Sequence, residues 1–409
     1  MAKPKIRFKG YQDDWEQRKL SEIAIRVTEK NKNNEFTEPF TNSAELGIIS
    51  QKEYFEREIV NDENLGGYYI VRKDDFVYNP RISGTAPVGP INRNRLERNG
   101  VMSPLYTVFR VHDIADLYLE YYFKTTNWHR FMKLNGDSGA RFDRFTISST
   151  QFMEMPIPYP EVEEQKKIGA YFDHLDHLIT LHQRKCEETK KLKKFMLQKM
   201  FPQNGSLVPE IRFDGFTDDW EQRKLGDDIV NIHTGTNLIG SESNSGLPLI
   251  KMGNIQRGYF DTSKLEYLAE NEYPEKEDIA NYGDFFFNTR NTLELVGKGA
   301  TWMGTSGEYA FNSNIARFEF KNIDTIFLNY LYNTEDMTRQ IHARAMGTTS
   351  VAAIYPRNLE SVEYYVPIME EQQMIGSYFQ SIDRLITLHQ QKCDDLINLK
   401  KYMLQNMFV

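Results

Sequence analysis

Two pairs of histidine and cysteine have the spacing of metal ligands. His182 and Cys186 are four residues apart, and His389 and Cys393 repeat that spacing in the second half of the chain. Residues four apart lie on one face of a helix, so two such helices side by side could offer a Cys2His2 zinc site. Polar residues in a helix seam also fix its register. We favour the register role, and stoichiometric zinc in the purified protein would overturn this interpretation.

Motifs of the common enzyme classes are missing from the sequence. It has no GxxxxGK[ST], GxGxxG, HExxH or GxSxG pattern. Residues 78–81 (YNPR) approach an amino-methyltransferase motif but lack its second proline and its aromatic residue. Adjacent acidic residues such as Asp74 and Asp75 are typical of exposed turns. The sequence therefore indicates a protein that binds without catalysing and that holds no cofactor or metal of its own.

Composition and charge set further limits. Only two cysteines occur in 409 residues, which is consistent with a reducing compartment. No apolar run approaches the ~20 residues of a membrane span, so we expect a cytoplasmic protein. The net charge of −8 divides into +3 for residues 1–205 and −11 for residues 206–409. A nucleic-acid partner would therefore have to be bound through local basic patches.

Such patches occur in polar loops between strand-like runs. Arginine can read guanine, asparagine and glutamine can read adenine, and serine or threonine can hold phosphates. The same residues are also common in structural turns, so the collective pattern carries more weight than any one position. The candidate DNA-binding residues are Arg81, Ser83, Thr85, Arg93, Asn94, Arg95, Arg141, Arg144, Asn254, Gln256, Arg257, Arg290, Asn291, Lys298, Asn314, Arg344, Thr348, Thr349 and Arg357.

The elements that must position these loops occur twice in the sequence. The octapeptide DDWEQRKL occupies residues 13–20 and returns at residues 218–225. Residues 163–201 match residues 370–408 at 24 of 39 positions. Such internal similarity indicates a duplicated structural unit. Each half is thus a variable module followed by a repeated, helix-forming segment.

The modules share a plan despite their different sequences. Asp75, Asn79 and Arg81 align with Asp284, Asn288 and Arg290 near the end of a strand-like run. Helix-like runs follow at residues 116–134 and 326–345, then a loop of small residues, a short strand-like stretch and proline. This order predicts two α+β modules of mixed α/β structure.

The two long segments are predicted to be coiled-coil helices. Apolar residues recur at alternating steps of four and three, the period of a coiled-coil seam. About forty residues would give a helix of roughly 60 Å. Because the apolar seam of one helix must be shielded from water, we expect the two copies to pack as an antiparallel pair. The seam residues that we take as the candidate subunit interface are Ile168, Phe172, Leu175, Ile179, Ile375, Phe379, Ile382 and Ile386.

Five lysines crowd the end of the first helix: Lys190, Lys191, Lys193, Lys194 and Lys199. They are typical of a solvated face that complements the helix dipole. Phosphate contact or docking of a partner subunit are the alternatives.

The chain resembles the specificity subunit of type I restriction-modification systems. The resemblance rests on both DDWEQRKL segments, on GDFFFNTR at residues 283–290, and on EEQKKIGAYF and EEQQMIGSYF at residues 163–172 and 370–379. The first module departs from the pattern, with KDDF at residues 73–76 where GDFF is usual. Its loop boundaries are therefore less well defined.

The resemblance implies two pseudo-symmetric target recognition domains separated by two long antiparallel helices, each domain reading one half of a bipartite DNA site. The domains would be residues 1–160, with the repeated segment 4–20, and residues 226–368; the spacer helices would be 161–201 and 369–409, and residues 202–225 a linker with the second repeated segment. It also implies two methyltransferase subunits and two restriction subunits as partners, which would hold S-adenosylmethionine, ATP and Mg²⁺.

Two other functions fit the sequence less well. A self-contained DNA-modifying enzyme would need the cofactor motifs that are missing, and activity of the lone chain would revive it. A protein-binding scaffold would not read bases, and failure to select any sequence from random duplexes would support it.

The repeated octapeptide is interpreted as a joint. We expect Trp15 and Trp220, with Leu20 and Leu225, to pack where each module meets the helix that arrives from the other half.

Overall fold

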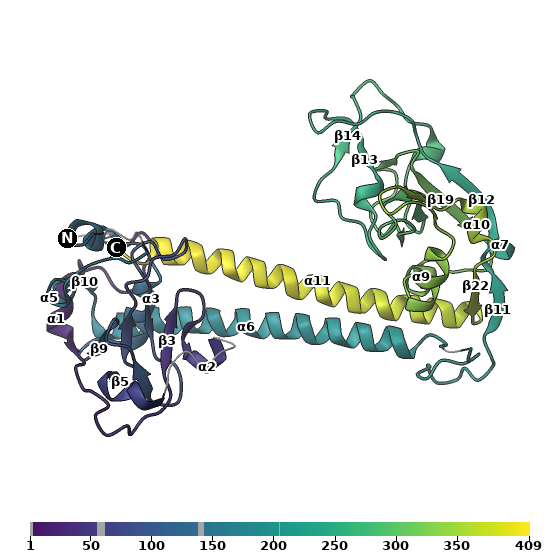
Figure 1. The fold of residues 1–409 in the computed structure, drawn as a ribbon. Helices are drawn as coiled ribbons and strands as arrows, with labels where there is room; N and C mark the ends of the chain where they lie inside the picture. Colours follow the sequence, from purple (N-terminus) through teal and green to yellow (C-terminus); the bar gives the residue numbers. More distant parts are fainter. Residues whose placement is uncertain (1–2, 55–61, 138–142, 204) are drawn as a thin grey trace. The chain divides into compact units, whose positions relative to one another are not determined.

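The computed structural model describes residues 3–54, 62–137, 143–203 and 205–409. The chain forms two compact units (Figure 1). The first unit comprises Met1–Gln183 and Gln391–Val409, and the second comprises Arg184–Gln390. Each unit therefore contains one module, the first part of the helix that follows it and the last part of the other long helix.

The first module is built on a four-stranded antiparallel sheet in the order β2-β9-β6-β7. These strands are Ala24–Arg26, Thr107–Val111, Phe76–Tyr78 and Ile91–Arg93. All three residues of β6 are buried, as expected for an aromatic and β-branched central strand. Smaller elements surround the sheet: β3 (Phe40–Ser43), β4 (Gly47–Ser50), β5 (Tyr69–Val71), β8 (Gly100–Met102), α1 (Leu20–Ile23), α2 (Gln51–Tyr54), η1 (Asp62–Gly67) and α5 (Ser149–Met153).

The second module repeats this sheet in the order β12-β19-β15-β17. The strands are Ile229–Thr234, Ile315–Phe320, Phe285–Asn288 and Gly299–Thr301. The second module also has two three-stranded sheets, β14-β13-β18 and β16-β21-β20. Their strands and the remaining short elements are β13 (Pro248–Ile250), β14 (Glu266–Tyr267), β16 (Arg290–Asn291), β18 (Ala310–Phe311), β20 (Met346–Gly347), β21 (Ala352–Ala353), α7 (Leu225–Asp228), α10 (Pro356–Leu359), η2 (Met252–Asn254) and η3 (Lys276–Asp278).

Each helix-like run after the sheet is two short helices instead of one. The first run gives α3 (Asp116–Phe123) and α4 (His129–Asn135), and the second gives α8 (Thr325–Leu331) and α9 (Glu335–His342). Threonine interrupts both runs. The Thr125 hydroxyl donates to the Tyr122 carbonyl oxygen at 2.7 Å, and Thr334 caps the start of α9. Because such side chains compete with the helical backbone, the apolar periodicity alone could not reveal the break.

The long helices α6 (Val162–Lys199) and α11 (Met369–Asn406) are antiparallel in each unit, as predicted (Figure 1). In the first unit the ring of Phe172, near the start of α6, stacks on Phe408 with centroids 5.7 Å apart. In the second unit Phe379, near the start of α11, stacks on Phe201 at 5.9 Å. The start of each helix is therefore packed against the end of the other.

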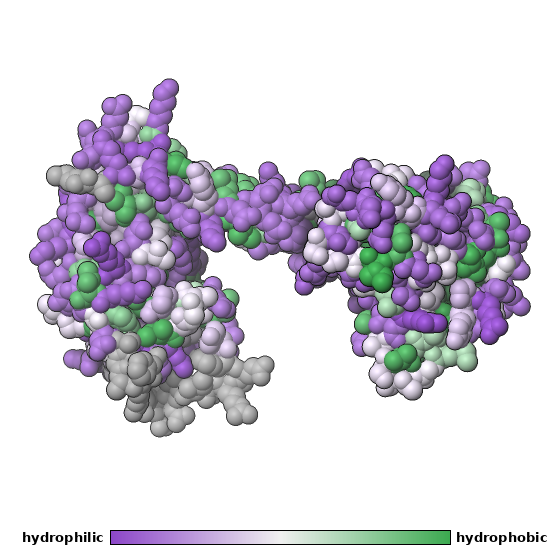
Figure 2. Space-filling model, turned by 90° about the horizontal axis from the view of Figure 1, so that it is seen from above, coloured by the Kyte–Doolittle hydropathy of each residue, from purple (hydrophilic) through white to green (hydrophobic). Residues whose placement is uncertain are grey.

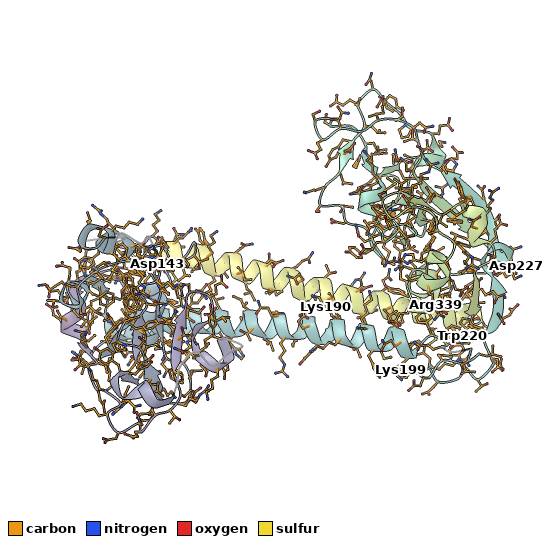
Figure 3. The ribbon with its side chains drawn as sticks, viewed as in Figure 1. Asp143, Lys190, Lys199, Trp220, Asp227 and Arg339 are labelled. Atoms are coloured by element: carbon orange, nitrogen blue, oxygen red, sulfur yellow. The ribbon has the colours of Figure 1, made fainter. Side chains whose placement is uncertain are left out.

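The octapeptide forms a joint, as predicted. Its EQRK residues are strand β1 (Glu16–Lys19), which pairs with β10 (Pro156–Tyr159), and strand β11 (Glu221–Lys224), which pairs with β22 (Glu363–Val366). Trp220 is buried against Phe201 at the end of α6, with ring centroids 6.2 Å apart (Figure 3). Trp15 lies in the core that includes Phe408 at the end of α11.

The face shown in Figure 2 is mostly hydrophilic, with small hydrophobic patches among the polar residues. Within the described parts of the chain, no helix is both long enough and apolar enough to cross a membrane.

Candidate nucleic-acid interface

In each sheet, one aspartate directly before the central strand binds the backbone and a neighbouring arginine. The Asp75 carboxylate accepts a hydrogen bond from the Arg72 amide at 2.7 Å, and Asp284 accepts one from the Asn281 amide at 2.8 Å. Arginines on the neighbouring strand pair with both, Arg110 with Asp75 at 2.7 Å and Arg317 with Asp284 at 3.4 Å. The aspartates of the shared plan are therefore structural. Neither arginine was singled out from the sequence, because strand pairing alone brings them there.

The asparagines of the shared plan turn the chain at the end of this strand. Asn79 Oδ1 accepts a hydrogen bond from the Arg81 amide at 3.0 Å, and Asn288 Oδ1 accepts one from the Arg290 amide at 3.1 Å. Both arginines are exposed. Within the described part of the chain, their guanidinium groups form no hydrogen bond or ion pair. The frame thus presents one free arginine at the same end of each sheet.

In the first module this end of the sheet opens into a polar groove of about 990 Å³. Candidate residues Arg81, Ser83 and Thr85 line it, and the backbone of Arg81 pairs with that of exposed Arg144. A cluster of polar side chains can form the hydrogen bonds by which proteins bind base edges and phosphates. Sequence reasoning missed further polar lining, which comes from distant segments and includes one carboxylate: Thr41, Asn42, Ser43, Glu45, Gln51, Tyr54, Tyr68 and Tyr106.

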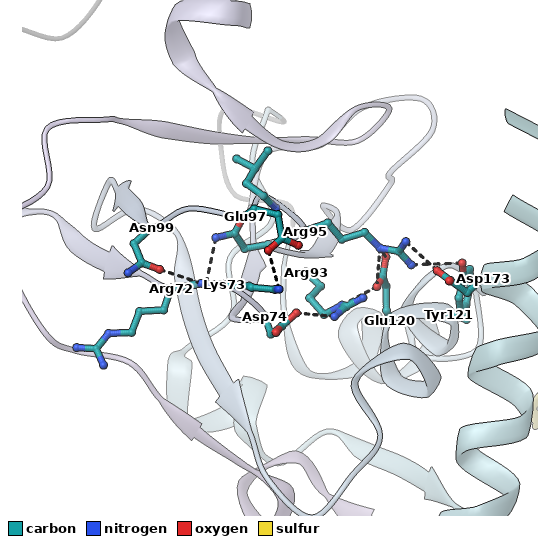
Figure 4. A network of polar contacts seen from close by, with 12 residues as sticks. Arg72, Lys73, Asp74, Arg93, Arg95, Glu97, Asn99, Glu120, Tyr121 and Asp173 are labelled. Carbon is teal, nitrogen blue, oxygen red and sulfur yellow. Dashed lines mark hydrogen bonds and ion pairs between the residues drawn. The ribbon is translucent and has the colours of Figure 1, made fainter. Parts of the chain in front are cut away.

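Three other candidates of the first module, Arg93, Arg95 and Asn94, have structural roles instead, and Figure 4 shows the two arginines. Arg93 pairs with Asp74 at 2.6 Å and with Glu120 at 2.7 Å. Arg95 also pairs with Glu120, at 2.8 Å, and reaches Asp173 on α6 at 2.9 Å. Asn94 is fully buried, and its side chain donates to the Arg72 carbonyl oxygen at 3.0 Å and accepts from the Leu96 amide at 3.1 Å. The pairs with Asp74 and Glu120 lie within the module, and the Arg95–Asp173 pair ties the module to its helix. Arg141 lies outside the described residues.

In the second module the corresponding end of the sheet carries the hairpin β20–β21. Arg290 and Asn291, in β16, pair with Ala353 and Ala352 of this hairpin. Candidates Thr348 and Thr349 are exposed at its tip, and exposed Arg357 lies over the ring of Tyr355. Thr349 and Arg357 are exposed to a ligand, whereas the Thr348 hydroxyl accepts from the Val351 amide at 3.3 Å and Asn291 Oδ1 accepts from the Thr292 amide at 2.8 Å.

Three candidates of the second module are occupied within the chain. The Asn254 amide group donates to the carbonyl oxygens of Asp261 and Lys264. Asn314 donates to Asn312 Oδ1 at 2.9 Å. Arg344 uses its guanidinium to bind Ser361 and the Gln340 carbonyl oxygen. They shape loops, as turn residues commonly do, so they leave the set of base-contacting candidates.

The remaining candidates, Gln256, Arg257 and Lys298, meet in space although they lie on separate segments. Lys298 Nζ donates to Gln256 Oε1 at 2.7 Å, and Arg257 Nη2 lies 3.0 Å from His342 Nε2.

The seam residues lie inside the chain's own helix pairing. Seven are buried in the cores of the two units, and Ile386 is half-buried. A partner subunit would therefore have to meet other faces of the helices. Among those faces, the lysine cluster is largely ion-paired, through Lys190 with Glu187, Lys193 with Asp383 and Lys199 with Glu210 (Figure 3).

The Cys186 thiol packs in this helix pair. Its Sγ lies 3.9 Å from the Ile386 carbonyl oxygen and 3.8 Å from Gln390 Oε1. Throughout the described ranges, no three or more His, Cys, Asp and Glu side chains converge as metal ligands.

A tyrosine, an aspartate and a lysine fasten each module to both helices. In the first unit Asp176 accepts from the Tyr121 hydroxyl at 2.8 Å and pairs with Lys400 at 2.5 Å. In the second unit Asp383 accepts from Tyr330 at 2.9 Å and pairs with Lys193 at 2.6 Å. The Tyr–Asp–Lys contact is thus the same in both units.

A duplicated α+β module with a polar sheet end, packed on a pair of long helices, defines a modular binding protein. The sequence matches the family model described as "Type I restriction modification DNA specificity domain" over residues 12–191 and 217–397, and the chain belongs to this family.

Curated relatives in Methanocaldococcus jannaschii include the type I restriction enzyme MjaVIII specificity subunit, 26% identical over 61% of this chain and 60% of that protein. The putative MjaX specificity subunit is 27% identical over 47% of this chain and 46% of that protein. The chain thus spans about half the length of these relatives. The crystal structure of the type I restriction-modification system S subunit from M. genitalium has a TM-score of 0.59 at 12% identity, covering 100% of this chain and 99% of that one. It shares the fold.

Proposed function

We propose that this chain is the DNA specificity subunit of a type I restriction-modification complex, in which each module reads one half of a bipartite, asymmetric DNA site. The observation that carries the proposal is one repeated frame with two unlike sheet ends. The frame presents Arg81 and Arg290 alike, but the described side chains beside them differ: Ser83 and Thr85 line a polar groove with Arg81, and the hairpin that pairs with Arg290 exposes Thr348 and Thr349. Reading two different half-sites requires this combination of constant support and variable surface.

The exposed side chains have the chemistry of base readout. A guanidinium can donate two hydrogen bonds to guanine, and amides and hydroxyls can bind other base edges or phosphates. The helices set the gap between half-sites, since a helix has a fixed rise per residue.

Apolar side chains outside the seam support docking of partner subunits on the helices. Leu192 and Phe195 of α6 are 46% and 47% exposed. Their repeat equivalents in α11, Leu399 and Tyr402, are 41% and 55% exposed. Because exposed apolar groups at repeated positions favour burial against protein, we propose that two methyltransferase (modification) subunits dock on these faces. S-adenosylmethionine, ATP and Mg²⁺ belong to these and to two restriction subunits, and this chain is not itself catalytic.

Selection from a pool of random duplexes tests the proposal. The chain, co-purified with type I modification subunits from its host, should enrich two short fixed sequences separated by a gap of constant length. Enrichment of no sequence would contradict DNA reading and favour a protein-binding scaffold.

A further inference from the structure

Basic side chains gather without an acidic partner at the hairpin end of the second sheet. Arg257 follows η2, Lys298 immediately precedes β17, and His342 ends α9. All three are half-buried. Of the described carboxylates, none lies within ion-pair distance of Arg257 or Lys298, whose nearest polar contacts are His342 and Gln256.

Most other partly buried cations of this unit are ion-paired, and half-buried Arg344 instead fills its donors with Ser361 and the Gln340 carbonyl oxygen. Arg212 meets Glu371 at 2.7 Å, and Lys251 meets Glu266 at 2.6 Å. Pairing is expected, because a charge that is partly removed from water without a counter-charge is unfavourable. Arg257 and Lys298 depart from this pattern side by side.

Two buried hydrogen-bond donors without a partner among the described residues lie at the same end of the sheet. Arg257 Nη1 is buried and has no hydrogen-bond partner, and the same holds for Asn288 Nδ2 at the end of β15. Burial, and then the charge of Arg257, lower the pKa of Lys298, while the charge of Glu294, beyond ion-pair distance, opposes the shift. Burial and Arg257 also lower the pKa of His342, which suits its Nε2 to accept from Arg257 as a neutral ring. An anion here would satisfy the free donor and offset the repulsion.

The basic cluster of Arg257, Lys298 and His342 lies near exposed Arg290. The Lys298 carbonyl oxygen accepts from the Asn288 amide at 2.8 Å, and Asn288 in turn holds the amide of Arg290. In the first module the carbonyl oxygen of Pro90 accepts the equivalent bond from Asn79 at 3.0 Å. The lysine is therefore specific to the second module.

We propose that Arg257 and Lys298 form a phosphate-binding site, which holds the DNA backbone while Arg290 and the hairpin reach the bases. The inference rests on the proposed DNA-reading function and assigns these two candidates to backbone contact. Phosphate fits better than a base edge, because it supplies the missing negative charge and accepts several charge-assisted hydrogen bonds. Local cations of this kind also matter more in a half with a net charge of −11.

The test uses Lys298→Gln and Arg257→Gln in the full chain, purified with its modification subunits. Binding is measured across a salt series to a labelled duplex that carries the selected site and to a duplex in which that site is scrambled. Each variant should weaken both duplexes by similar factors and reduce the slope of log K against log salt by about 1. Lys298→Arg should retain the wild-type slope. Lys251→Gln, which removes a paired lysine of the same module, is the matched control.

Several results would overturn the phosphate site. A wild-type salt slope in both variants would do so, and so would a changed base preference at an unchanged slope, which would assign base readout. Loss of subunit assembly with unaltered DNA contact would assign an acidic protein surface. Thermal melting checks that each variant is folded. If the wild type does not prefer its selected duplex, the proposed function fails, and the slope of its non-selective binding still tests the phosphate site.

Discussion

Arg7 and Glu164, 157 residues apart in sequence, form a two-point ion pair at the start of α6. Arg7 Nε and Nη2 donate to the two carboxylate oxygens at 2.7 and 2.8 Å. Arg212 and Glu371 repeat the pair at 2.7 Å for both bonds. Both carboxylates are fully buried, so each pair fixes a repeated segment to the helix start.

Replacing Glu371 with alanine should destabilise the second unit by about 3 kcal/mol, because it leaves the largely buried Arg212 without its counter-charge. Denaturant unfolding measures the loss. Glu370→Ala, at the exposed neighbouring position, should cost less than about 0.5 kcal/mol. Equal effects of the two substitutions would contradict the structural role of the pair.

Stability should fall at alkaline pH through buried tyrosines. Burial, reinforced by nearby Asp383, raises the pKa of Tyr330. A raised pKa means that the neutral form is favoured in the folded state, so this contribution is present below about pH 10, the ordinary tyrosine value, and is lost as the pH rises further. Tyr330→Phe should cost about 1 kcal/mol at neutral pH through its lost hydrogen bond and flatten the alkaline decline. Tyr273→Phe, at an exposed position, should leave the pH profile unchanged; an unaltered profile in both variants would contradict the account.

Arg81→Ala and Arg290→Ala should each weaken discrimination in one half-site only, by about 1–3 kcal/mol if the contact is to a base. Assembly with partner subunits should persist, because neither side chain supports the fold. Competition between duplexes with single base changes measures the effect. Arg26→Ala removes an exposed arginine outside the groove and serves as the control. Unchanged selectivity in both half-sites would remove these two arginines from the interface.

Leu192→Glu combined with Phe195→Glu should reduce binding of one modification subunit at least tenfold while leaving the helix pair folded, since both side chains lie outside the seam. Analytical ultracentrifugation of the complex measures the number of bound subunits. Arg184→Glu changes charge on the same helix without changing apolar area. If this control weakens binding equally, the contact is electrostatic and the apolar docking face is wrong.

The repeated elements could be predicted from the sequence because duplication and apolar periodicity are local signals. The helices, their antiparallel packing and the joint at Trp220 followed from them. The breaks between α3 and α4 and between α8 and α9 did not, since a threonine hydroxyl can end a helix without disturbing the apolar pattern.

The candidate site was predicted less completely. Arg93 and Arg95 were indistinguishable from Arg81 in sequence. Only the fold reveals that both form ion pairs with Glu120 in α3. Conversely, Asn42 and Tyr106 line the groove from distant segments that carry no signal of their own. Ion pairs and grooves depend on tertiary placement, which composition does not encode.

Sequencing of DNA methylation in a host that carries this chain with its modification subunits tests the central claim most directly. The account predicts one methylated, bipartite motif with two unlike half-sites and a gap of fixed length. Arg81→Ala and Arg290→Ala should relax different halves of it. A single uninterrupted motif, or methylation that does not depend on this chain, would contradict the account.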